Sequence, residues 1–384
     1  MKNEIKTICF YLPQFHSIPE NDNAYGKGFT EWTNVKKAHP LFPGHVQPKI
    51  PLNNNYYSLM DPSVMEKQAR LAKEYGIYGF CYYHYWFKNR KKLLEKPIEM
   101  MLANPQIDIP FCLCWANENW TKKWDGGNNE IIVEQDYGNM SDLNKHVDYL
   151  CKYFSDKRYI TVDGAPLLLI YKPELIPGIR KYIKMIRERA KENGFKKIKI
   201  AVQYPKYFFD GGMLNLFDYY IEFEPQFIIS YEMNRNRRRI NKMVKPVLLN
   251  FGARGFVNKI EEKRTDKTLT INHKNTLEIR DYDEDWEKII SHDVRNKKML
   301  AGAFVDWDNT SRNINGRVYK GASPEKFNYY MSKLVRKVRS EYSEKIIFIN
   351  AWNEWAEGAY LEPDENNKYE YLNALKDALN INVN

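Results

Sequence analysis

Residues 346–352 read IIFINAW, and they lead directly into the polar and aromatic stretch NEWAEG at residues 353–358. The runs PLLLIY at 166–171 and IYGFCYY at 77–83 are apolar in the same continuous way. A strand buried on both faces has such a run instead of an alternation of apolar and polar residues, and parallel sheets require burial on both faces. These runs therefore predict a parallel sheet.

Eight short runs of the β type lie along the chain, separated mostly by helical patterns. The strands are predicted at residues 5–11, 77–84, 109–115, 166–171, 198–204, 218–223, 300–307 and 346–352. The helices are predicted at about residues 61–75, 91–102, 141–154, 179–193, 283–296, 324–342 and 368–379. Strand and helix that alternate eight times predict an α/β fold, the (β/α)8 or TIM barrel.

The competing fold is a doubly wound sheet, which usually has a glycine-rich phosphate loop after its first strand. The sequence contains neither G-x-G-x-x-G nor G-x-x-x-x-G-K-[ST], so we favour the barrel and predict no nucleotide cofactor. Two connections are unusually long, residues 12–60 after the first strand and 225–282 after the sixth. Both follow a carboxyl end, where barrel active sites lie, and are expected to form groove walls or a lid. We predict one domain over 1–384, with 225–282 as an insertion within it.

The composition excludes several classes of protein. The 384 residues include 59 Lys and Arg against 49 Asp and Glu, a net charge of +10, and 28% of residues are charged. This balance excludes a disordered chain, a collagen-like chain and a coiled coil. Aromatic residues make up 15% and offer flat faces to sugars or nucleobases. Because no nucleic-acid-binding signature is present, we predict no nucleic acid partner.

The cysteines and the N-terminus predict the compartment. The five cysteines are odd in number and lie mostly in apolar runs, which favours a reduced, cytoplasmic protein. Neither the core of a signal peptide nor a membrane span is seen. The basic run Arg235, Arg237, Arg238 and Arg239 reads as a solvated loop. The alternative for this run is contact with an anionic glycan or a membrane surface, which would make the protein membrane-associated.

The side chains at the predicted carboxyl ends are aromatic, amide or carboxylate, and no Ser or Cys is paired with a His. This mixture suits a sugar, because rings stack on aromatic faces and hydroxyls pair with amides and imidazoles. The predicted substrate-binding residues are Tyr11, Gln14, His16, Tyr83, His84, Trp86, Trp115, Asn117, Glu118, Trp120, Gln203, Glu222, Asp306, Trp307, Asn353 and Trp355.

The pair Glu354 and Glu357 is the first candidate for catalysis. Cleavage of a glycosidic bond needs one carboxylic acid and one carboxylate, and these two glutamates are three residues apart, beside Trp352 and Trp355. Like charges at close range would move their pKa values apart. The alternative is that both glutamates only favour a helix dipole.

For several other candidate residues, contact with the ligand and a structural role both stay open. Glu222 and Glu224 share a face of a strand and either reach the site or pair with a basic residue at the rim. One of Asp306 and Asp308 is expected to contact ligand. His16 and His84 lack metal-ligand spacing, so we predict hydrogen bonding and no metal. Glu31 and Trp32 either line the substrate groove or pack within the long connection of residues 12–60.

Six blocks of the sequence, spread along nearly the whole chain, resemble a known family. They read FYLPQFHSIPENDNAYGKGFTEWTNV, YGFCYYHYWF, PFCLCWANENWT, DGAPLLLIYKP, DWDNTSR and FINAWNEWAEGAYLEPD. They are similar to the WbsX-type proteins, which are associated with bacterial O-antigen and capsule biosynthesis and often labelled glycosyltransferases. That family is in turn similar to the family-99 glycoside hydrolases, the endo-α-mannosidase group. Residues 225–282 match least.

The resemblance implies a TIM barrel and a retaining mechanism without a metal. Position by position, Glu354 corresponds to the base that activates the 2-hydroxyl of the substrate to give an anhydro-sugar, and Glu357 corresponds to the general acid. Ala356 stands where the endo-mannosidase group has His, so the sugar specificity need not be shared. The function predicted first is an endo-acting hydrolase or transglycosylase on a bacterial polysaccharide or oligosaccharide. The alternatives are a glycosyltransferase with a nucleotide- or lipid-linked donor and a non-catalytic glycan-binding barrel.

Overall fold

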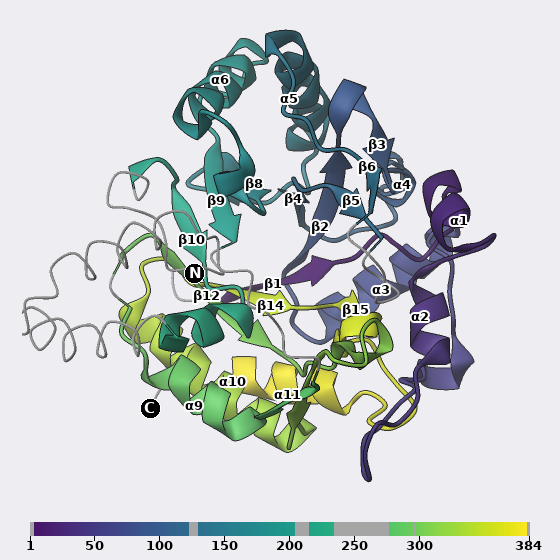
Figure 1. The fold of residues 1–384 in the computed structure, drawn as a ribbon. Helices are drawn as coiled ribbons and strands as arrows, with labels where there is room; N and C mark the ends of the chain where they lie inside the picture. The colour runs from purple at the N-terminus through teal and green to yellow at the C-terminus, as the bar shows by residue number, and fades with distance from the viewer. Residues whose placement is uncertain (1–3, 123–129, 204–214, 234–275, 295, 382–384) are drawn as a thin grey trace, which may run out of the picture.

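Eight parallel strands close a barrel in the computed structural model, which describes residues 4–122, 130–203, 215–233, 276–294 and 296–381 (Figure 1). The strands are β1 (Lys6–Tyr11), β2 (Gly79–Trp86), β4 (Phe111–Trp115), β8 (Ala165–Ile170), β9 (Lys199–Gln203), β10 (Tyr219–Ile221), β12 (Met299–Phe304) and β14 (Ile346–Asn350). Neighbours pair in this order, and β14 pairs with β1 to close the ring. Each predicted strand overlaps one of these, so the TIM barrel is confirmed.

Helices cover the outside of the barrel. They are α3 (Pro62–Glu74), α4 (Lys96–Ala103), α5 (Met140–Phe154), α6 (Ile179–Glu192), α9 (Tyr282–Ser291), α10 (Pro324–Glu341) and α11 (Glu370–Leu379). Figure 1 shows α5 and α6 on one side of the barrel and α9, α10 and α11 on the opposite side. The Asp61 carboxylate accepts the Ser63 N–H and so begins α3 as a cap.

Two of the predicted helices have different limits in the structure. The helix expected at 91–102 begins only at Lys96, because Lys92–Leu93 form a short strand, β3, that pairs with the end of β2. Pro97 lies in the first turn of α4, where its missing N–H removes no helical hydrogen bond. The helix expected at 283–296 ends at Ser291, because His292 has an extended backbone.

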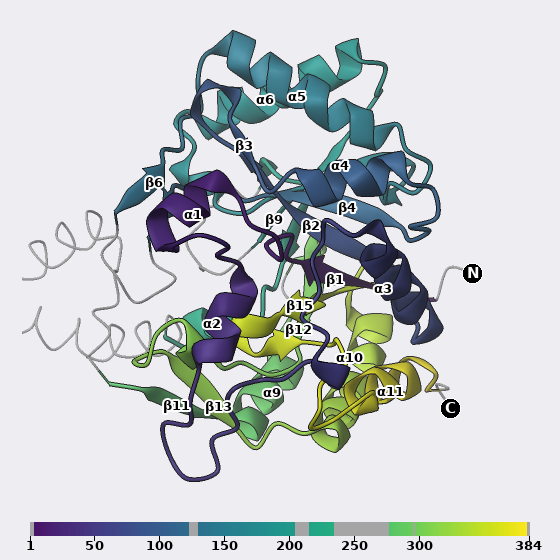
Figure 2. The same cartoon turned by 90° about the vertical axis from the view of Figure 1, so that its right-hand side faces the viewer.

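The long connection after β1 contains structure of its own. It forms α1 (Pro19–Tyr25), α2 (Glu31–Lys37) and a 3-10 turn, η1 (Leu52–Asn54). Figures 1 and 2 both show α2 beside β15 (Asn353–Glu354), the strand that follows the last barrel strand. The chain from residues 12–60 therefore forms one side of the region where the candidate catalytic residues lie.

Other short strands lie outside the barrel. They are β5 (Trp120–Thr121), β6 (Ile131–Val133), β7 (Thr161–Val162), β11 (Glu278–Asp281), β13 (Arg317–Lys320) and β16 (Ala359–Tyr360). Of the predicted insertion, residues 226–233 are helical and β11 pairs with β13. The run Arg235 to Arg239 lies outside the described residues. The extent of the domain and the role of 225–282 stay predictions.

The barrel is closely packed where its strands meet. A Cβ atom added to Gly302 of β12 would lie 1.5 Å from the carbonyl oxygen of Glu222, so only glycine permits this approach of β10 and β12. All five cysteines are buried as free thiols. Among the helices of the described residues, none has both the length and the apolar character needed to cross a membrane.

Candidate active site

A pocket of about 340 Å³ opens at the carboxyl ends of the barrel strands. It is lined by aromatic rings, amides and charged side chains that come from both halves of the chain. The lining residues are Leu12, Gln14, Tyr83, Tyr85, Ala116, Glu118, Asn119, Trp120, Thr121, Tyr171, Phe223, Gln226, Trp307, Arg312, Glu354 and Glu357. Both predicted catalytic glutamates therefore face one pocket at the barrel face where TIM-barrel active sites lie.

One guanidinium joins three carboxylates at this pocket. Arg312 donates from Nη1 to Glu357 at 2.5 Å, and from Nη2 to Glu31 at 2.5 Å and to Glu354 at 3.4 Å. Glu31 begins α2 and is fully buried. Arg312 follows the 3-10 turn η5 (Asn309–Ser311), and Glu357 ends the 3-10 turn η6 (Trp355–Glu357). The site is thus built from three segments that are far apart in the sequence.

The electrostatics favour a shared proton on the glutamate pair. Burial raises the pKa of Glu354 well above its usual value; the charge of Glu357 adds to this rise, and Arg312 opposes it. Burial also raises the pKa of Glu357, again against the effect of Arg312. Glu31 and Glu354 are buried and Glu357 is partly buried, and one positive charge cannot balance three negative charges at such a site, so one carboxyl retains its proton near neutral pH. An acid and a carboxylate side by side are what glycosidic bond cleavage requires.

The backbone around Glu357 depends on a glycine. Gly358 has a φ of 61°, and a Cβ atom there would lie 2.9 Å from both the Cβ and the N of Asp308. The Asp308 N–H donates to the Glu357 carbonyl at 2.6 Å. The Asp308 carboxylate in turn accepts from Gln47 and Thr310 and bonds His45, which fixes the loop after β12. Asp308 therefore positions the chain that carries Glu357.

Neither Asp306 nor Asp308 lines the pocket, although one of them was expected to contact ligand. Both carboxylate oxygens of Asp308 are in hydrogen bonds within the protein. Asp306 faces Lys49 at 3.9 Å, and burial raises its pKa to about 6 against the opposing charge of that lysine. Trp307, the residue between them, does line the pocket. Its Nε1 is buried without a partner among the described residues, which leaves a donor for a ligand.

Two predicted binding residues, Asn117 and Asn353, instead hold backbone segments. The Asn117 side chain accepts the Lys172 N–H at 2.7 Å and donates to the Lys172 carbonyl at 2.7 Å. The Asn353 side chain pairs in the same way with both backbone groups of Leu12, at 2.7 and 3.1 Å. Each side-chain amide thus pairs with the backbone N–H and C=O of one residue, as a neighbouring strand would, and so holds two segments together. Asn353 fixes the chain directly before Glu354.

The alternation of side chains along β2 separates its last residues into two groups. Tyr83 and Tyr85 line the pocket. His84 and Trp86 point to the opposite side of the strand, where both rings contact His146 of α5. Trp115 at the end of β4 packs on the same histidine. Neighbouring residues of a strand face opposite sides, so His84, Trp86 and Trp115 lie in the helix layer and are not brought to the pocket.

Four more predicted residues lie away from the pocket. The Tyr11 hydroxyl donates to Gln68 of α3, and Glu222 bonds His292 and Tyr342 between the barrel and α10. The Trp355 ring stacks on Tyr360 and donates to Glu362. His16 lines a different hollow beside α2. Of the two interpretations for Glu222, the pairing within the protein is the one that its contacts support.

Seven of the predicted residues do line the pocket: Gln14, Tyr83, Glu118, Trp120, Trp307, Glu354 and Glu357. Gln203 lies close beneath and donates to the Tyr83 hydroxyl at 3.3 Å. Gln14 donates to Tyr85, and its Oε1 is buried without a partner within the part of the chain that the structure describes. Glu118 pairs with Lys172 at the edge of the pocket. The lining therefore offers a ligand both acceptors and donors.

Arg312 was missed from the sequence, and Glu31 was considered only as groove lining or loop packing. Arg312 could have been noticed in the sequence, because it is the one basic residue between Ala301 and Gly316. Within the described residues, no group of three or more His, Cys, Asp or Glu side chains is arranged to hold a metal ion.

Comparisons with known proteins give a family and a fold. The family model described as Glycosyltransferase WbsX matches residues 7–375. In two strains of Xanthomonas campestris pv. campestris, the protein named Uncharacterized protein WxcX is 36% identical over 376 residues, which are 97% of this chain and 49% of that protein. The chain thus spans about half the length of the curated relatives it matches.

Solved structures with the same fold include the GH99 endo-alpha-mannosidase from Bacteroides thetaiotaomicron. Its TM-score is 0.52 at 13% identity, over 97% of this chain and 96% of that one. A protein described as glycoside hydrolase-like has a TM-score of 0.56 at 12% identity, over 100% and 96%. These identities are low, so the likeness establishes the barrel fold alone.

Proposed function

The chain belongs to the WbsX glycosyltransferase family, and on that premise we propose that it is a retaining carbohydrate-active enzyme acting on a bacterial surface polysaccharide. The observation that carries the proposal is the meeting of Glu354 and Glu357 on one guanidinium in a pocket lined by aromatic rings. Two crowded carboxylates, one buried and one partly buried, hold a proton in a way that binding of a sugar alone would not need. The pair therefore supports an enzyme over a non-catalytic glycan-binding barrel.

The proposed chemistry uses the 2-hydroxyl of the substrate. Glu354 takes the hydroxyl proton while the 2-oxygen bonds to the anomeric carbon, and Glu357 gives its proton to the departing glycosidic oxygen. Water or an acceptor hydroxyl then opens the anhydro-sugar as the two proton transfers reverse, so the configuration is retained. Tyr83, Tyr85, Trp120 and Trp307 are proposed to hold the sugar rings, and Gln14 and Glu118 to hold hydroxyls.

The position of Arg312 places a condition on these roles. Arg312 is closer to Glu357, at 2.5 Å, than to Glu354, at 3.4 Å, which favours the proton on Glu354. Glu357 can act as the acid only if substrate binding weakens its contact with Arg312. An activated leaving group needs no acid, so Glu357→Gln should retain turnover of an aryl glycoside that Glu354→Gln loses. If instead Glu354→Gln retains this turnover and Glu357→Gln loses it, Glu354 is the acid and Glu357 is the base.

A glycosyltransferase is the second candidate, favoured by the name of the family. Of the described residues that line the pocket, Glu118, Glu354 and Glu357 are acidic and Arg312 is the single basic one. This charge disfavours a nucleotide-diphosphate donor, which would be repelled. Transfer from a glycan donor meets no such barrier, because a sugar hydroxyl can open the anhydro-sugar in place of water. We therefore place hydrolysis and transglycosylation ahead of a nucleotide-dependent transfer.

Product analysis on the surface polysaccharide of the organism that encodes the chain tests the proposal. We expect wild type to release oligosaccharides, and Glu354→Gln and Glu357→Gln to release none. Glu188→Gln, at an exposed position on α6, is the matched control and should behave as wild type. Longer products on addition of a free oligosaccharide would indicate transfer. Release by both active-site variants would refute the proposed pair.

A further inference from the structure

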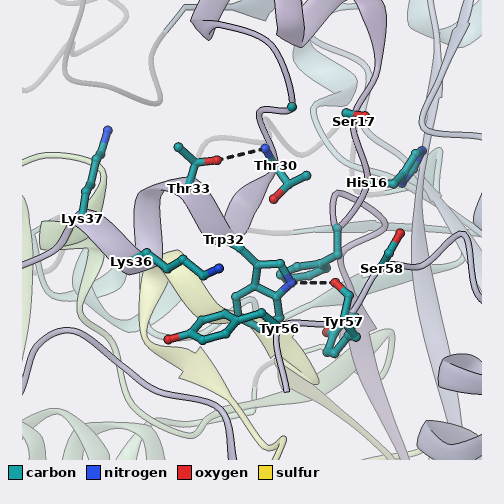
Figure 3. A pocket seen from close by; sticks show the side chains of 12 residues that line it. His16, Ser17, Thr30, Trp32, Thr33, Lys36, Lys37, Tyr56, Tyr57 and Ser58 are labelled. Carbon is teal, nitrogen blue, oxygen red and sulfur yellow. Dashed lines mark hydrogen bonds between the residues drawn. The ribbon is translucent and has the colours of Figure 1, made fainter. Parts of the chain in front are cut away.

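A second, larger hollow lies beside the active site, and we call it the α2 groove. Its volume is about 680 Å³. It is lined by Phe15, His16, Ser17, Gly28, Thr30, Trp32, Thr33, Lys36, Lys37, Tyr56, Tyr57 and Ser58. Figure 3 shows these side chains around the Trp32 ring. Helix α2 therefore directs Glu31 to the active site and Trp32, Thr33, Lys36 and Lys37 to the groove.

The α2 groove has a fixed aromatic base. The Trp32 Nε1 donates to the Tyr57 carbonyl at 2.8 Å, which holds the indole in place. The Tyr56 ring meets Trp32 edge-on with centroids 5.2 Å apart, and Phe15 packs on Trp32 at 4.7 Å. Ser17 and Ser58 present exposed hydroxyls beside these rings. Rigid rings next to hydroxyl groups suit the apolar faces and polar edges of a sugar.

The charge of the groove is opposite to that of the active site. Lys36 and Lys37 line it, and among the described residues that do so none is Asp or Glu. The Lys36 ammonium lies over the Tyr56 ring at 4.0 Å from its centroid. Nearby, the Asp22 carboxylate is occupied by the N–H groups of Gly28 and Phe29. A ligand with negative charge is therefore favoured here.

Two packed tryptophan rings connect the wall of the α2 groove to the segment that carries the glutamate pair. The Trp32 ring contacts the Trp355 ring at 5.3 Å, and Trp355 lies between Glu354 and Glu357 in the sequence. The residue before Trp32 is Glu31, which bonds Arg312. A chain of sugars that leaves the active-site pocket would have this groove as a neighbouring place to bind.

We propose that the α2 groove binds an acidic sugar unit of a saccharide chain, with Lys36 and Lys37 pairing with its carboxylate and the partly exposed Tyr56, held against the buried Trp32, contacting its ring. The choice of a saccharide rests on the proposed function, whereas the preference for an anion rests on the groove alone. The groove would hold a polymer at a point distant from the bond that is cut, and so favour acidic polysaccharides over neutral ones.

Calorimetric titration of the full chain carrying Glu357→Gln tests this proposal, because that variant should not consume the ligand. The probes are a hexamer of galacturonic acid and the neutral maltohexaose. We expect the acidic hexamer to bind and the neutral one to bind at least about tenfold more weakly. Binding should weaken as NaCl is raised from about 0.05 to about 0.5 M, because exposed charges are screened.

Two variants locate the binding. Lys36→Ala with Lys37→Ala should weaken binding of the acidic hexamer by about tenfold or more. Both lysines are exposed, so folding should be unaffected. Lys181→Ala with Lys184→Ala removes the same charge from exposed sites on α6 and should leave binding unchanged.

Equal binding of the two hexamers, or full binding by the Lys36 and Lys37 variant, would overturn the proposal. The same holds if anionic vesicles are bound through these lysines and the hexamer is not. Binding that depends on Lys36 and Lys37 would support an acidic-sugar site in the α2 groove even if wild type releases no oligosaccharides. Oligosaccharide release tests only the proposed function.

Discussion

The two hollows beside α2 differ in almost every physical property, although one short helix contributes to both. The active-site pocket holds buried carboxylates around Arg312 and has an excess of negative charge. The α2 groove is more open, is lined by Lys36 and Lys37, and has no acidic lining residue among those described. Burial shifts pKa values and so prepares groups to transfer protons, whereas exposed charge attracts a ligand without changing its chemistry. The contrast fits the two roles proposed above, catalysis in the acidic pocket and binding of an acidic saccharide in the α2 groove.

The largest expected effect comes from removing the cation of the acidic pocket. Arg312→Met leaves the buried Glu31 and Glu354 and the partly buried Glu357 without a counter-charge, so we expect a loss of about 3–5 kcal/mol in the free energy of unfolding at neutral pH. Part of this loss should return at acidic pH, because protonation removes the repulsion. Urea denaturation at both pH values measures it. Arg180→Met, at an exposed site on α6, should change stability by less than about 0.5 kcal/mol.

A second prediction concerns the wall between the hollows. Glu362 accepts hydrogen bonds from Trp355, Tyr57 and Gln68, and burial raises its pKa to about 7 despite these bonds. The unfolded value is about 4.3, so the folded state keeps a proton that the unfolded state loses. The stability contributed by this proton is full below about pH 4.3 and is lost as pH rises through about 7, a change of about 4 kcal/mol.

Glu362→Gln should therefore flatten the dependence of unfolding free energy on pH. Urea denaturation between about pH 5 and about pH 8 measures the slope for each protein. Glu365→Gln, which is exposed, should keep the slope of wild type. Identical slopes for wild type and the Glu362 variant would show that this carboxyl does not titrate in the folded protein.

Asn353 tests how far the acidic pocket depends on its backbone support. Asn353→Ala leaves the N–H and the carbonyl of Leu12 without their partner, and we expect a loss of about 1–3 kcal/mol in unfolding free energy. Asn117→Ala breaks the equivalent pair of bonds to Lys172 and should destabilise to a similar degree. Only the Asn353 variant should lower kcat strongly, because Asn353 precedes Glu354. Equal kcat losses in both variants would contradict this positioning role.

The smallest expected effect on stability comes from the basic groove. Lys36→Ala with Lys37→Ala should change the free energy of unfolding by less than about 0.5 kcal/mol, since both side chains are exposed. Turnover of a short neutral substrate should also be unchanged, while KM for an acidic polysaccharide rises. A fall in kcat for the short substrate would mean that the two hollows are not separate in function.

The sequence predicted the barrel well because continuous apolar runs identify buried parallel strands. It also placed Glu354 and Glu357 at the correct end of the barrel. It could not decide which of two neighbouring residues faces inward, so Tyr83 and His84 were both named although only Tyr83 lines the pocket. The sequence also could not predict which residues far apart along the chain are in contact. The bond between Arg312 and Glu31 spans 281 residues, and the one between Asn353 and Leu12 spans 341.

The five buried thiols give this molecule an internal probe of its own opening. Cys9, Cys81, Cys112, Cys114 and Cys151 are free and buried, and burial raises the pKa of Cys9, Cys81 and Cys151. A thiol reagent in solution reacts with the thiolate, so it reaches these groups only when the surrounding structure separates. Four of the five lie on β1, β2 and β4, three adjacent barrel strands, and Cys151 lies on α5. The rate of labelling at each cysteine would thus report how often this third of the barrel opens, with no residue changed.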